Sequence, residues 1–217
     1  MAKSIPKVIG LVGGIASGKS SAADVLVELG AVKIDADAIG HELLTRATVM
    51  RQVSIALGPK IVDQESNPPV IDRQKLAGMV FSTDPAAKQN LKKLEAILHP
   101  QIHAESIRRL RRLTESEEPP LAVVLDAPLL IEANWAPTCD WILYLDASYE
   151  SRVSRANKRG WTEQHFRDRE SAQYPLEVKR KAATHVIPSE NEQEMRAELK
   201  SLWEQISSSS QTSPDPS

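Results

Sequence analysis

The chain has 217 residues, a formal net charge of −2 and 41% apolar residues, which is typical of a globular protein of one or two domains. The small net charge argues against a dedicated nucleic-acid-binding protein. The single cysteine, Cys139, excludes an internal disulfide and favours a reducing compartment. No export signal and no apolar stretch long enough to span a bilayer is visible, so we expect a cytoplasmic protein with no membrane or nucleic-acid partner.

Short apolar runs alternate with longer amphipathic stretches along the chain. The apolar runs predict strands of a buried parallel sheet, because they are brief, rich in branched residues and apolar on both faces. These runs cover 7–12, 31–35, 121–126, 141–146 and 185–187. The predicted helices cover 19–29, 52–57, 72–80, 85–98 and 101–113. Strands that alternate with helices predict βαβ units, and therefore an α/β fold.

The organisation of the chain follows from this pattern. The helical block of about residues 52–115 has no predicted strand of its own, so we interpret it as an insertion in a single domain of residues 1–205. The segment of about residues 148–181 is the most charged part and is the candidate for a lid. Residues 206–217 offer nothing to bury, and we expect them to form a disordered tail.

A glycine-rich loop, Gly13–Ser20, follows the first predicted strand and matches the phosphate-binding pattern G-x-x-x-x-G-K-[ST]. The strand–loop–helix setting favours backbone N–H groups converging on phosphate oxygens over an accidental glycine-rich turn. Lys19 is expected to reach the β- and γ-phosphates, and the Ser20 hydroxyl to join a Mg²⁺ shell. The residues expected to hold the nucleotide are Gly13, Gly14, Ile15, Ala16, Ser17, Gly18, Lys19, Ser20 and Ser21.

Two carboxylates, Asp35 and Asp37, stand at the carboxyl end of the second predicted strand. Ligands of open α/β sheets bind outside the carboxyl ends of strands, so this pair can orient an acceptor hydroxyl or assist with Mg²⁺. The alternative is that Asp37 simply caps the helix that carries His41 and Leu44.

The third predicted strand ends in Asp126. An apolar strand that ends in Asp resembles a Walker B segment, whose carboxylate reaches Mg²⁺ directly or through water. The alternative is a buried strand that only ends in a turn at Pro128.

Arg152, Arg155 and Arg159 recur at i, i+3 and i+7 and therefore share one face of a predicted helix. A charge run alone favours a solvated face, but beside a phosphate loop such arginines can close over the transferring phosphates as a lid does. A second basic cluster, interpreted as the solvated face of an amphipathic helix, consists of Arg108, Arg109, Arg111 and Arg112.

Taken together, these pieces resemble the dephospho-coenzyme A kinase family over nearly the whole chain, to about residue 187. The phosphate loop is generic to many kinases, whereas Asp-Ala-Asp, Leu-His-Pro and Pro-Leu-Leu in this order are far more specific. The matching stretches are Gly13–Ser20, Ile34–Asp37, Ile71–Arg73 with Leu76, Val80-Phe81, Leu98–Pro100, Pro128–Leu130 with Glu132, and the spaced Arg169, Gln173 and Lys179.

The resemblance implies a P-loop kinase core, with a five-stranded parallel sheet flanked by helices, an inserted helical substrate domain and a lid over ATP. It implies transfer of the ATP γ-phosphoryl group to the ribose 3′-hydroxyl of dephospho-CoA, the last step of coenzyme A biosynthesis, with Mg²⁺. The implied catalytic residues are Asp37 as base, Lys19 and Arg155. Arg155 and Arg159 match the lid contacts to ATP, and Ser20 and Asp126 the metal ligands. The implied substrate-binding residues are Asp35, Asp37, Arg73, His99 and Leu129.

Some positions depart from the family pattern. Ala16 stands where the family usually has glycine, and we expect it to take a negative φ; Ser21 replaces threonine. Thr184, Pro188 and Ser189 replace other residues in the region that borders the adenine pocket, which bears on ATP affinity or base preference.

Two alternatives stay open. One is another P-loop kinase that acts on a sugar or a nucleoside. The other is a nucleotide-binding regulator without chemistry, against which the intact Lys19, Ser20 and Asp37 argue.

Overall fold

The computed structural model describes residues 5–82 and 84–209, which fall into two compact units. The first unit contains the chain through Asp35 and again from Leu110 onward, and the second unit is Ala36–Arg109.

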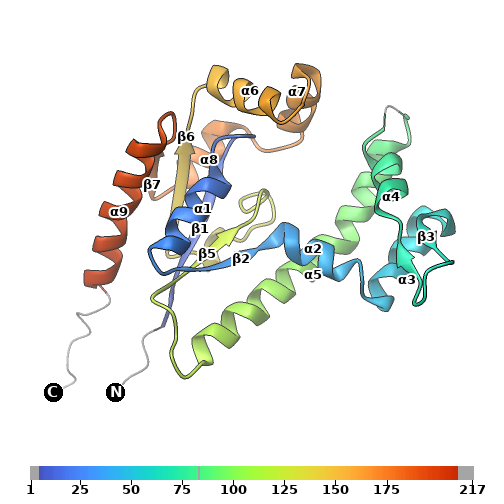
Figure 1. The fold of residues 1–217 in the computed structure, drawn as a ribbon, viewed down its shortest axis with the longest axis horizontal. Coiled ribbons are helices and arrows are strands. Elements are labelled where there is room, and N and C mark those ends of the chain that lie inside the picture. Colours follow the sequence, from blue (N-terminus) through green and yellow to red (C-terminus); the bar gives the residue numbers. More distant parts are fainter. Residues whose placement is uncertain (1–4, 83, 210–217) are drawn as a thin grey trace. The chain divides into compact units, whose positions relative to one another are not determined.

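The first unit is built on a five-stranded parallel sheet with the strand order β2-β5-β1-β6-β7 (Figure 1). Its strands are β1 (Lys7–Gly13), β2 (Val32–Asp35), β5 (Ala122–Asp126), β6 (Trp141–Asp146) and β7 (His185–Pro188). Every predicted strand is present, and the predicted α/β fold with a five-stranded parallel sheet is confirmed. The crossovers between parallel strands carry the helices that flank the sheet.

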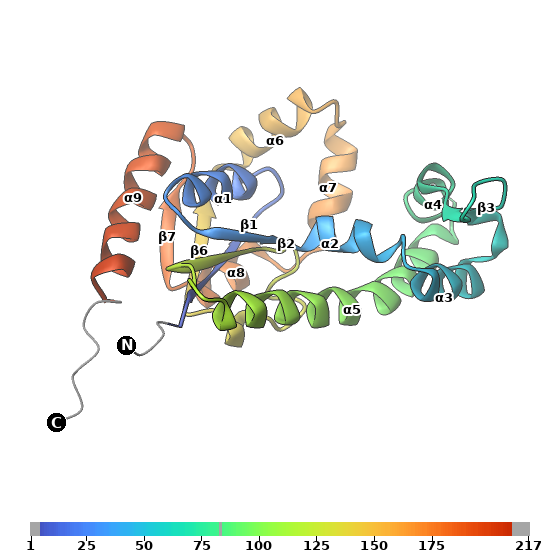
Figure 2. The same ribbon diagram turned by 60° about the horizontal axis from the view of Figure 1, so that its bottom comes forward.

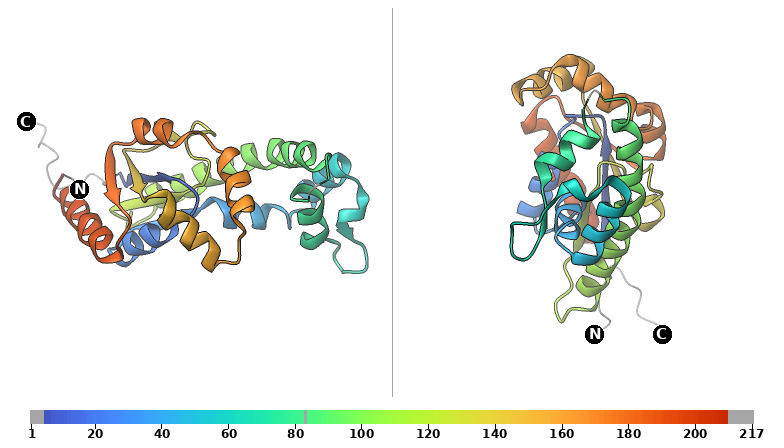
Figure 3. Two further views of the ribbon diagram at one scale, coloured as in Figure 1. Left: turned by 90° about the horizontal axis from the view of Figure 1, so that it is seen from above. Right: turned by 90° about the vertical axis from the view of Figure 1, so that its right-hand side faces the viewer.

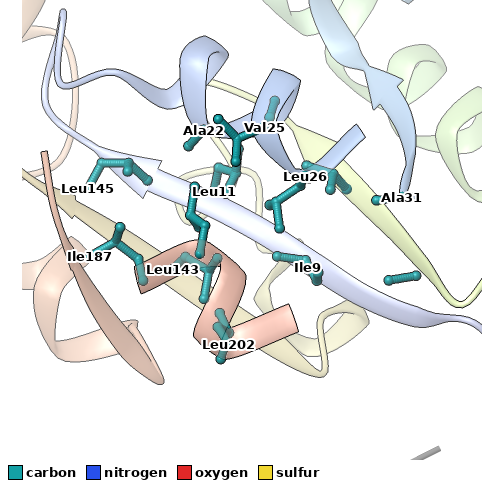
Figure 4. Packing of buried hydrophobic residues seen from close by; sticks show 14 of the residues in the cluster. Ile9, Leu11, Ala22, Val25, Leu26, Ala31, Leu143, Leu145, Ile187 and Leu202 are labelled. Carbon is teal, nitrogen blue, oxygen red and sulfur yellow. The ribbon is translucent and has the colours of Figure 1, made fainter. Parts of the chain in front are cut away.

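One hydrophobic core joins the sheet to α1 (Lys19–Glu28) and α9 (Glu192–Ser209). Figure 4 shows Leu11 of β1 beside α1, and Leu143 of β6 close to Leu202 of α9. Leu11, Leu143 and the α1 residue Leu26 are completely buried. The helix α8 (Leu176–Ala182) packs on β1 and β6, and η2 (Ala136–Thr138) precedes β6.

The predicted lid, about residues 148–181, contains most of α8 and two further helices, α6 (Tyr149–Lys158) and α7 (Glu163–Ser171), that lie beyond the carboxyl end of β6 (Figure 1). Both α6 and α7 begin at a side-chain cap, as is usual for helices that start with Ser or Thr. The Ser148 hydroxyl accepts from Ser151 N at 3.2 Å, and the Thr162 hydroxyl accepts from His165 N at 3.2 Å.

The second unit is mostly helical. It contains α2 (Ala36–Leu43), α3 (Ala47–Leu57), η1 (Pro59–Ile61), β3 (Val62–Asp63), β4 (Val70–Ile71), α4 (Arg73–Val80) and most of α5 (Ala87–Glu115). Figures 2 and 3 show α3, α4 and the small strands gathered around the amino-terminal half of α5. The Asp72 carboxylate caps α4 by accepting from Gln74 N and Lys75 N, each at 3.0 Å.

Several predicted boundaries differ from the structure. The inserted unit is 36–109 rather than about 52–115, because α2 already packs with this unit through Gly40 and Ile102. The expectation of no strand in the insertion is wrong, since β3 and β4 pair in antiparallel fashion.

The predicted break between helices 85–98 and 101–113 is also absent. Pro100 lies inside the continuous helix α5. Proline removes one backbone donor from a helix. In the same turn, the Gln101 side-chain amide donates from Nε2 to the Ile97 carbonyl oxygen at 2.9 Å.

The carboxyl-terminal tail begins later than predicted. Helix α9 continues to Ser209 and buries Ile206 in the core, so residues 206–209 are helical rather than disordered. The remaining part of the predicted tail, 210–217, lies outside the described residues.

Candidate active site

The carboxyl ends of β1, β2 and β5 bring the predicted phosphate loop and two acidic residues to one edge of the sheet. Gly13 is the last residue of β1, and Asp35 of β2 is the direct register partner of Asp126 of β5. Because parallel strands all end at the same edge, this arrangement is a consequence of the strand order. The first unit therefore places Asp35 and Asp126 next to one another beside the loop.

The phosphate loop turns through left-handed backbone conformations. Gly18 has φ 98°, as a residue without Cβ readily adopts, but Ala16 has φ 57°. The expected negative φ at Ala16 is therefore wrong. The loop geometry overrides the preference of an L-residue, at a cost of roughly 1–2 kcal/mol. The Ala16 carbonyl accepts a hydrogen bond from Arg155 Nη1 at 3.4 Å.

Lys19 is held against its own loop. Its Nζ donates to the carbonyl oxygens of Gly14 at 2.8 Å and Gly13 at 3.2 Å. Burial, and next the nearby Lys179 ammonium, lower the pKa of Lys19 to about 8, while Asp126 and Glu132 act in the opposite direction. An anionic ligand at this loop would relieve the mutual repulsion of the cations.

A buried ion pair lies within electrostatic range of Lys19. Lys179 of α8 is only 1% exposed, and its Nζ lies 3.0 Å from Glu132 Oε1 and 2.8 Å from Gln173 Oε1. The Tyr174 backbone N–H also donates to Glu132 Oε1, at 2.8 Å. None of these residues is in the predicted site. Glu132, Gln173 and Lys179 could have been found from the sequence, because they belong to the stretches that resemble the family.

The lid arginines differ in their surroundings. Arg155 donates to the backbone carbonyls of Ser189 and of Glu190, the latter at 3.2 Å. Arg159 is exposed at the end of α6. Arg152 is buried, with 3% exposure, and pairs with Glu170 of α7. The shared helical face predicted for these residues does not give them a shared environment.

A pocket of about 190 Å³ adjoins the helix end of the loop. Ser189, one of the departures from the family pattern, is buried there and donates from Oγ to the Ser17 carbonyl at 2.6 Å. Thr184 is not part of the lining: its hydroxyl accepts from Ile142 N at 3.0 Å and fixes β7 to β6. The lining residues are Gly18, Ser21, Arg155, Arg159, Ser189, Glu190, Glu192 and Met195.

Other predicted substrate residues belong to the second unit. Helix α2 begins at Ala36, so Asp37 lies exposed in its first turn. Arg73 Nη2 lies 2.9 Å from His41 Nε2. His99 is half-buried on α5, while Leu129 is half-buried in the first unit after β5.

The acidic edge fits a magnesium ion. Mg²⁺ prefers oxygen ligands and is usually bound by one or two carboxylates together with substrate phosphates. The Asp126 carboxylate lies close enough to Lys19 to raise its pKa, and Ser20 is adjacent to Lys19 on α1. Within residues 5–82 and 84–209, no group of three or more His, Cys, Asp or Glu residues could hold a metal ion. Phosphate oxygens and water would therefore complete the shell.

Two arginines of the second basic cluster, Arg108 and Arg109, pair with a buried carboxylate. Glu105 is 5% exposed and accepts from Arg108 Nε at 2.9 Å, Arg109 Nε at 3.1 Å and Arg46 Nη2 at 3.3 Å. The arginines, above all Arg108, lower the pKa of Glu105 to about 2 against the opposing effect of burial. Arg108, Arg111 and Arg112 are exposed, as the solvated-face interpretation expects, whereas Arg109 is half-buried.

Cys139 is a half-buried thiol outside this site. Burial, and then Asp140, raise its pKa to about 12, so it is not a reactive thiolate.

Comparisons with known proteins point to one family. A family model described as dephospho-CoA kinase matches residues 7–195. The dephospho-CoA kinase of Aquifex aeolicus is 34% identical over 202 residues, 92% of this chain and 97% of that protein. The dephospho-CoA kinase of Chromobacterium violaceum is 41% identical over 154 residues, 70% of each chain.

Solved structures are similar over nearly the whole chain. TT1252 from Thermus thermophilus has a TM-score of 0.72 at 34% identity, and the alignment covers 92% of this chain and 97% of that one. A shikimate kinase from Acinetobacter baumannii has a TM-score of 0.51 at 17% identity, over 96% of this chain and 97% of that one, which shows a shared fold alone. None of the described helices has both the length and the apolar character needed to cross a bilayer.

Proposed function

This chain belongs to the dephospho-CoA kinase family, and on that premise we propose how its residues phosphorylate the ribose 3′-hydroxyl of dephospho-CoA with ATP. The products are coenzyme A and ADP, and the enzyme is a transferase of coenzyme A biosynthesis. The main observation behind these roles is the phosphate loop. Its Lys19 ammonium donates to the Gly13 and Gly14 carbonyls beside the strand ends that hold Asp35 and Asp126.

The reaction is a transfer of one phosphoryl group. The 3′-oxygen forms a bond to the γ-phosphorus, and the bond from that phosphorus to the bridging oxygen breaks, so ADP leaves with the electron pair. Such transfers pass through a loose transition state, in which positioning and electrostatic stabilisation supply most of the catalysis. The residues of this chain should therefore act mainly by orienting and neutralising.

Positively charged groups of the phosphate loop and the lid bind the phosphates of ATP. Lys19 turns from the Gly13 and Gly14 carbonyls to the β- and γ-phosphates, and backbone N–H groups of the loop bind phosphate oxygens. Arg155 and Arg159 line the pocket beside Gly18 and close over the nucleotide from the lid side. That pocket is the proposed site for the adenine of ATP.

Ser20 and Asp126 are the groups that would hold Mg²⁺, which when bound supplies charge neutralisation on the phosphate oxygens. Asp35, the register partner of Asp126, would help to hold the ion or to orient the acceptor hydroxyl. A cytoplasmic location and the absence of nucleic-acid partners stay predictions from the sequence.

The acceptor is bound largely by the second unit. Arg73, held by His41, offers a cation to the substrate, and His99 offers a half-buried polar ring. Leu129, from the loop after β5, offers an apolar contact. The exposed Asp37 accepts the proton of the 3′-hydroxyl and, because a carboxylate is a weak base for a sugar hydroxyl, contributes mainly by positioning it.

The direct test is turnover of dephospho-CoA with ATP and Mg²⁺, with product mass and phosphorus NMR locating the new phosphate. Sugars and nucleosides are assayed as competing acceptors. Preferred phosphorylation of a sugar or nucleoside, or no transfer at all, would refute the proposal.

Asp37→Asn tests the assigned base. The variant keeps the shape of the side chain but loses its charge, and turnover should fall roughly 10²–10⁴-fold, the usual range for a positioned acid–base group. Binding of dephospho-CoA, measured by calorimetry, should change much less. Asp35→Asn is the matched control and should be milder; a larger loss in that control would exchange the two roles.

A further inference from the structure

Arg152 is a buried cation placed over the start of the phosphate loop. It lies in the first half of α6, which follows β6, and β6 is the register neighbour of β1, with Gly13 opposite Leu145. The chain that leaves β6 is therefore led across the point where β1 passes into the loop. Arg152 is 3% exposed in that position.

The guanidinium occupies the space that a side chain at Gly14 would need. A Cβ at Gly14 would lie 2.5 Å from Arg152 Nη1 and 2.9 Å from its Cζ. The φ of Gly14 is not in the left-handed region, so backbone conformation does not require glycine at this position. The missing side chain instead gives Arg152 access to the loop backbone.

Lys19 approaches the same residue. Its ammonium donates to the Gly14 carbonyl at 2.8 Å. The positive charge of Arg152 is one of the influences that lower the pKa of Lys19. Two cations therefore meet at Gly14, the end of the loop opposite to Gly18, where Arg155 lies.

Arg152 is fixed in place by its neighbours, but not all of its hydrogen-bond donors have partners. Glu170 binds its Nη1, and the rings of Phe166 and Tyr149 lie 5.5 Å and 5.8 Å from its Cζ. Its Nε is buried and, among the described residues, has no hydrogen-bond partner. A buried donor left without a partner is costly, and the guanidinium fork matches the geometry of a phosphate group.

We propose that Arg152 is a further catalytic residue, which donates from its guanidinium to the terminal phosphoryl group of the nucleoside triphosphate. Glu170 is its positioning residue. The inference rests on the proposed function for the identity of the reaction. The proposal gives the lid arginines different roles. Arg155 and Arg159 line the pocket beside Gly18, whereas Arg152 donates to the γ-phosphoryl group beside Gly14.

The test compares ligands with and without a γ-phosphate. In Arg152→Gln, the affinity for a non-hydrolysable ATP analogue with Mg²⁺, measured by calorimetry, should fall at least about tenfold, whereas ADP affinity should stay within about twofold. The turnover number should fall about 10²-fold, the usual effect of removing one such donor. Arg167→Gln is the matched control, because Arg167 is an exposed lid arginine paired with Glu163 of the same helix. It should change none of these values.

Arg152→Lys and Glu170→Gln test the same role if Arg152→Gln folds poorly. Arg152→Lys retains the charge beside Glu170 but lacks the fork, and it should lose part of the preference for the analogue over ADP. Glu170→Gln should lower the turnover number less than Arg152→Gln and retain part of that preference.

Equal weakening of the analogue and ADP in folded Arg152→Gln, or unchanged affinity and turnover, would overturn the proposal and leave Arg152 as a structural support for the lid. Wild-type turnover of dephospho-CoA is measured in parallel. If the wild type transfers no phosphate, the proposed function fails, and the two binding measurements still decide the role of Arg152.

Discussion

Beside the phosphate loop, a buried arginine pairs with a more exposed carboxylate. In the second unit, by contrast, a buried carboxylate is surrounded by more exposed arginines. Arg152 is 3% exposed and Glu170 28%. Glu105 is 5% exposed, while Arg46 and Arg108 are 46% and 44% exposed. The two clusters use the same side-chain types in opposite arrangements.

The difference lies in what each buried group still lacks. Both oxygens of Glu105 accept hydrogen bonds from arginines, so the carboxylate is fully used by its own unit. Arg152 retains a buried Nε without a partner among the described residues. A saturated buried charge contributes to the fold, whereas an unsaturated one beside a phosphate loop is suited to a ligand. Substitutions should therefore affect activity in one region and stability in the other.

Lys19→Ala should have the largest effect, mainly on turnover. Removal of its ammonium leaves the charge that develops on the phosphates uncompensated, and turnover should fall about 10³-fold or more. The free energy of unfolding, measured by urea titration, should change far less. Near-normal turnover in the folded variant would remove the phosphate loop from the mechanism.

Glu105→Gln should show the opposite behaviour. Loss of the buried charge leaves three arginines facing one another, and the free energy of unfolding should fall by about 3 kcal/mol, the usual cost of breaking a buried pair. Glu163→Gln is the control, because its pair with Arg167 is exposed and should contribute less than about 1 kcal/mol. Equal losses in the two variants would contradict the role of burial.

Acid should narrow the difference between wild type and Glu105→Gln. Arg108 and the other arginines lower the pKa of Glu105 from 4.5 to about 2, so this carboxylate stabilises the fold above pH 4.5. Protonation removes that contribution as the pH falls from 4.5 to about 2. Urea unfolding of both proteins across this range should show the difference in unfolding free energy shrinking. A constant difference would show that the charge of Glu105 is not the stabilising feature.

Ala16→Gly should have the smallest effect, and it should be favourable. Glycine removes the left-handed strain of about 1–2 kcal/mol, while its greater freedom in the unfolded chain offsets about 0.4–1 kcal/mol. We expect a rise of between about 0 and 1.6 kcal/mol in the free energy of unfolding, measured by urea titration. A loss of stability would mean that the Ala16 methyl group makes contacts that outweigh the strain.

Most of the core could be predicted from the sequence because its signals are local. Brief branched runs such as 121–126 form strands of a buried parallel sheet, and the pattern from Gly13 to Ser20 needs only a strand before it and a helix after it. The carboxyl ends of parallel strands then fix Asp35 and Asp126 at the loop. The Pro100 boundary failed because helix α5 continues through the proline in spite of the lost backbone donor.

What the sequence by itself determined is the sheet, the loop and which residues share a helical face. Periodicity puts Arg152 and Arg155 on one face of α6, with Arg159 directly after the helix, but only the passage of α6 over the end of β1 decides that Arg152 is buried against Gly14. Helical spacing already places Arg108 and Arg109 beside Glu105, whereas only tertiary packing brings Arg46 to the same carboxylate and buries it. Burial sets much of the energy of a charge, and it comes from segments far apart in the chain.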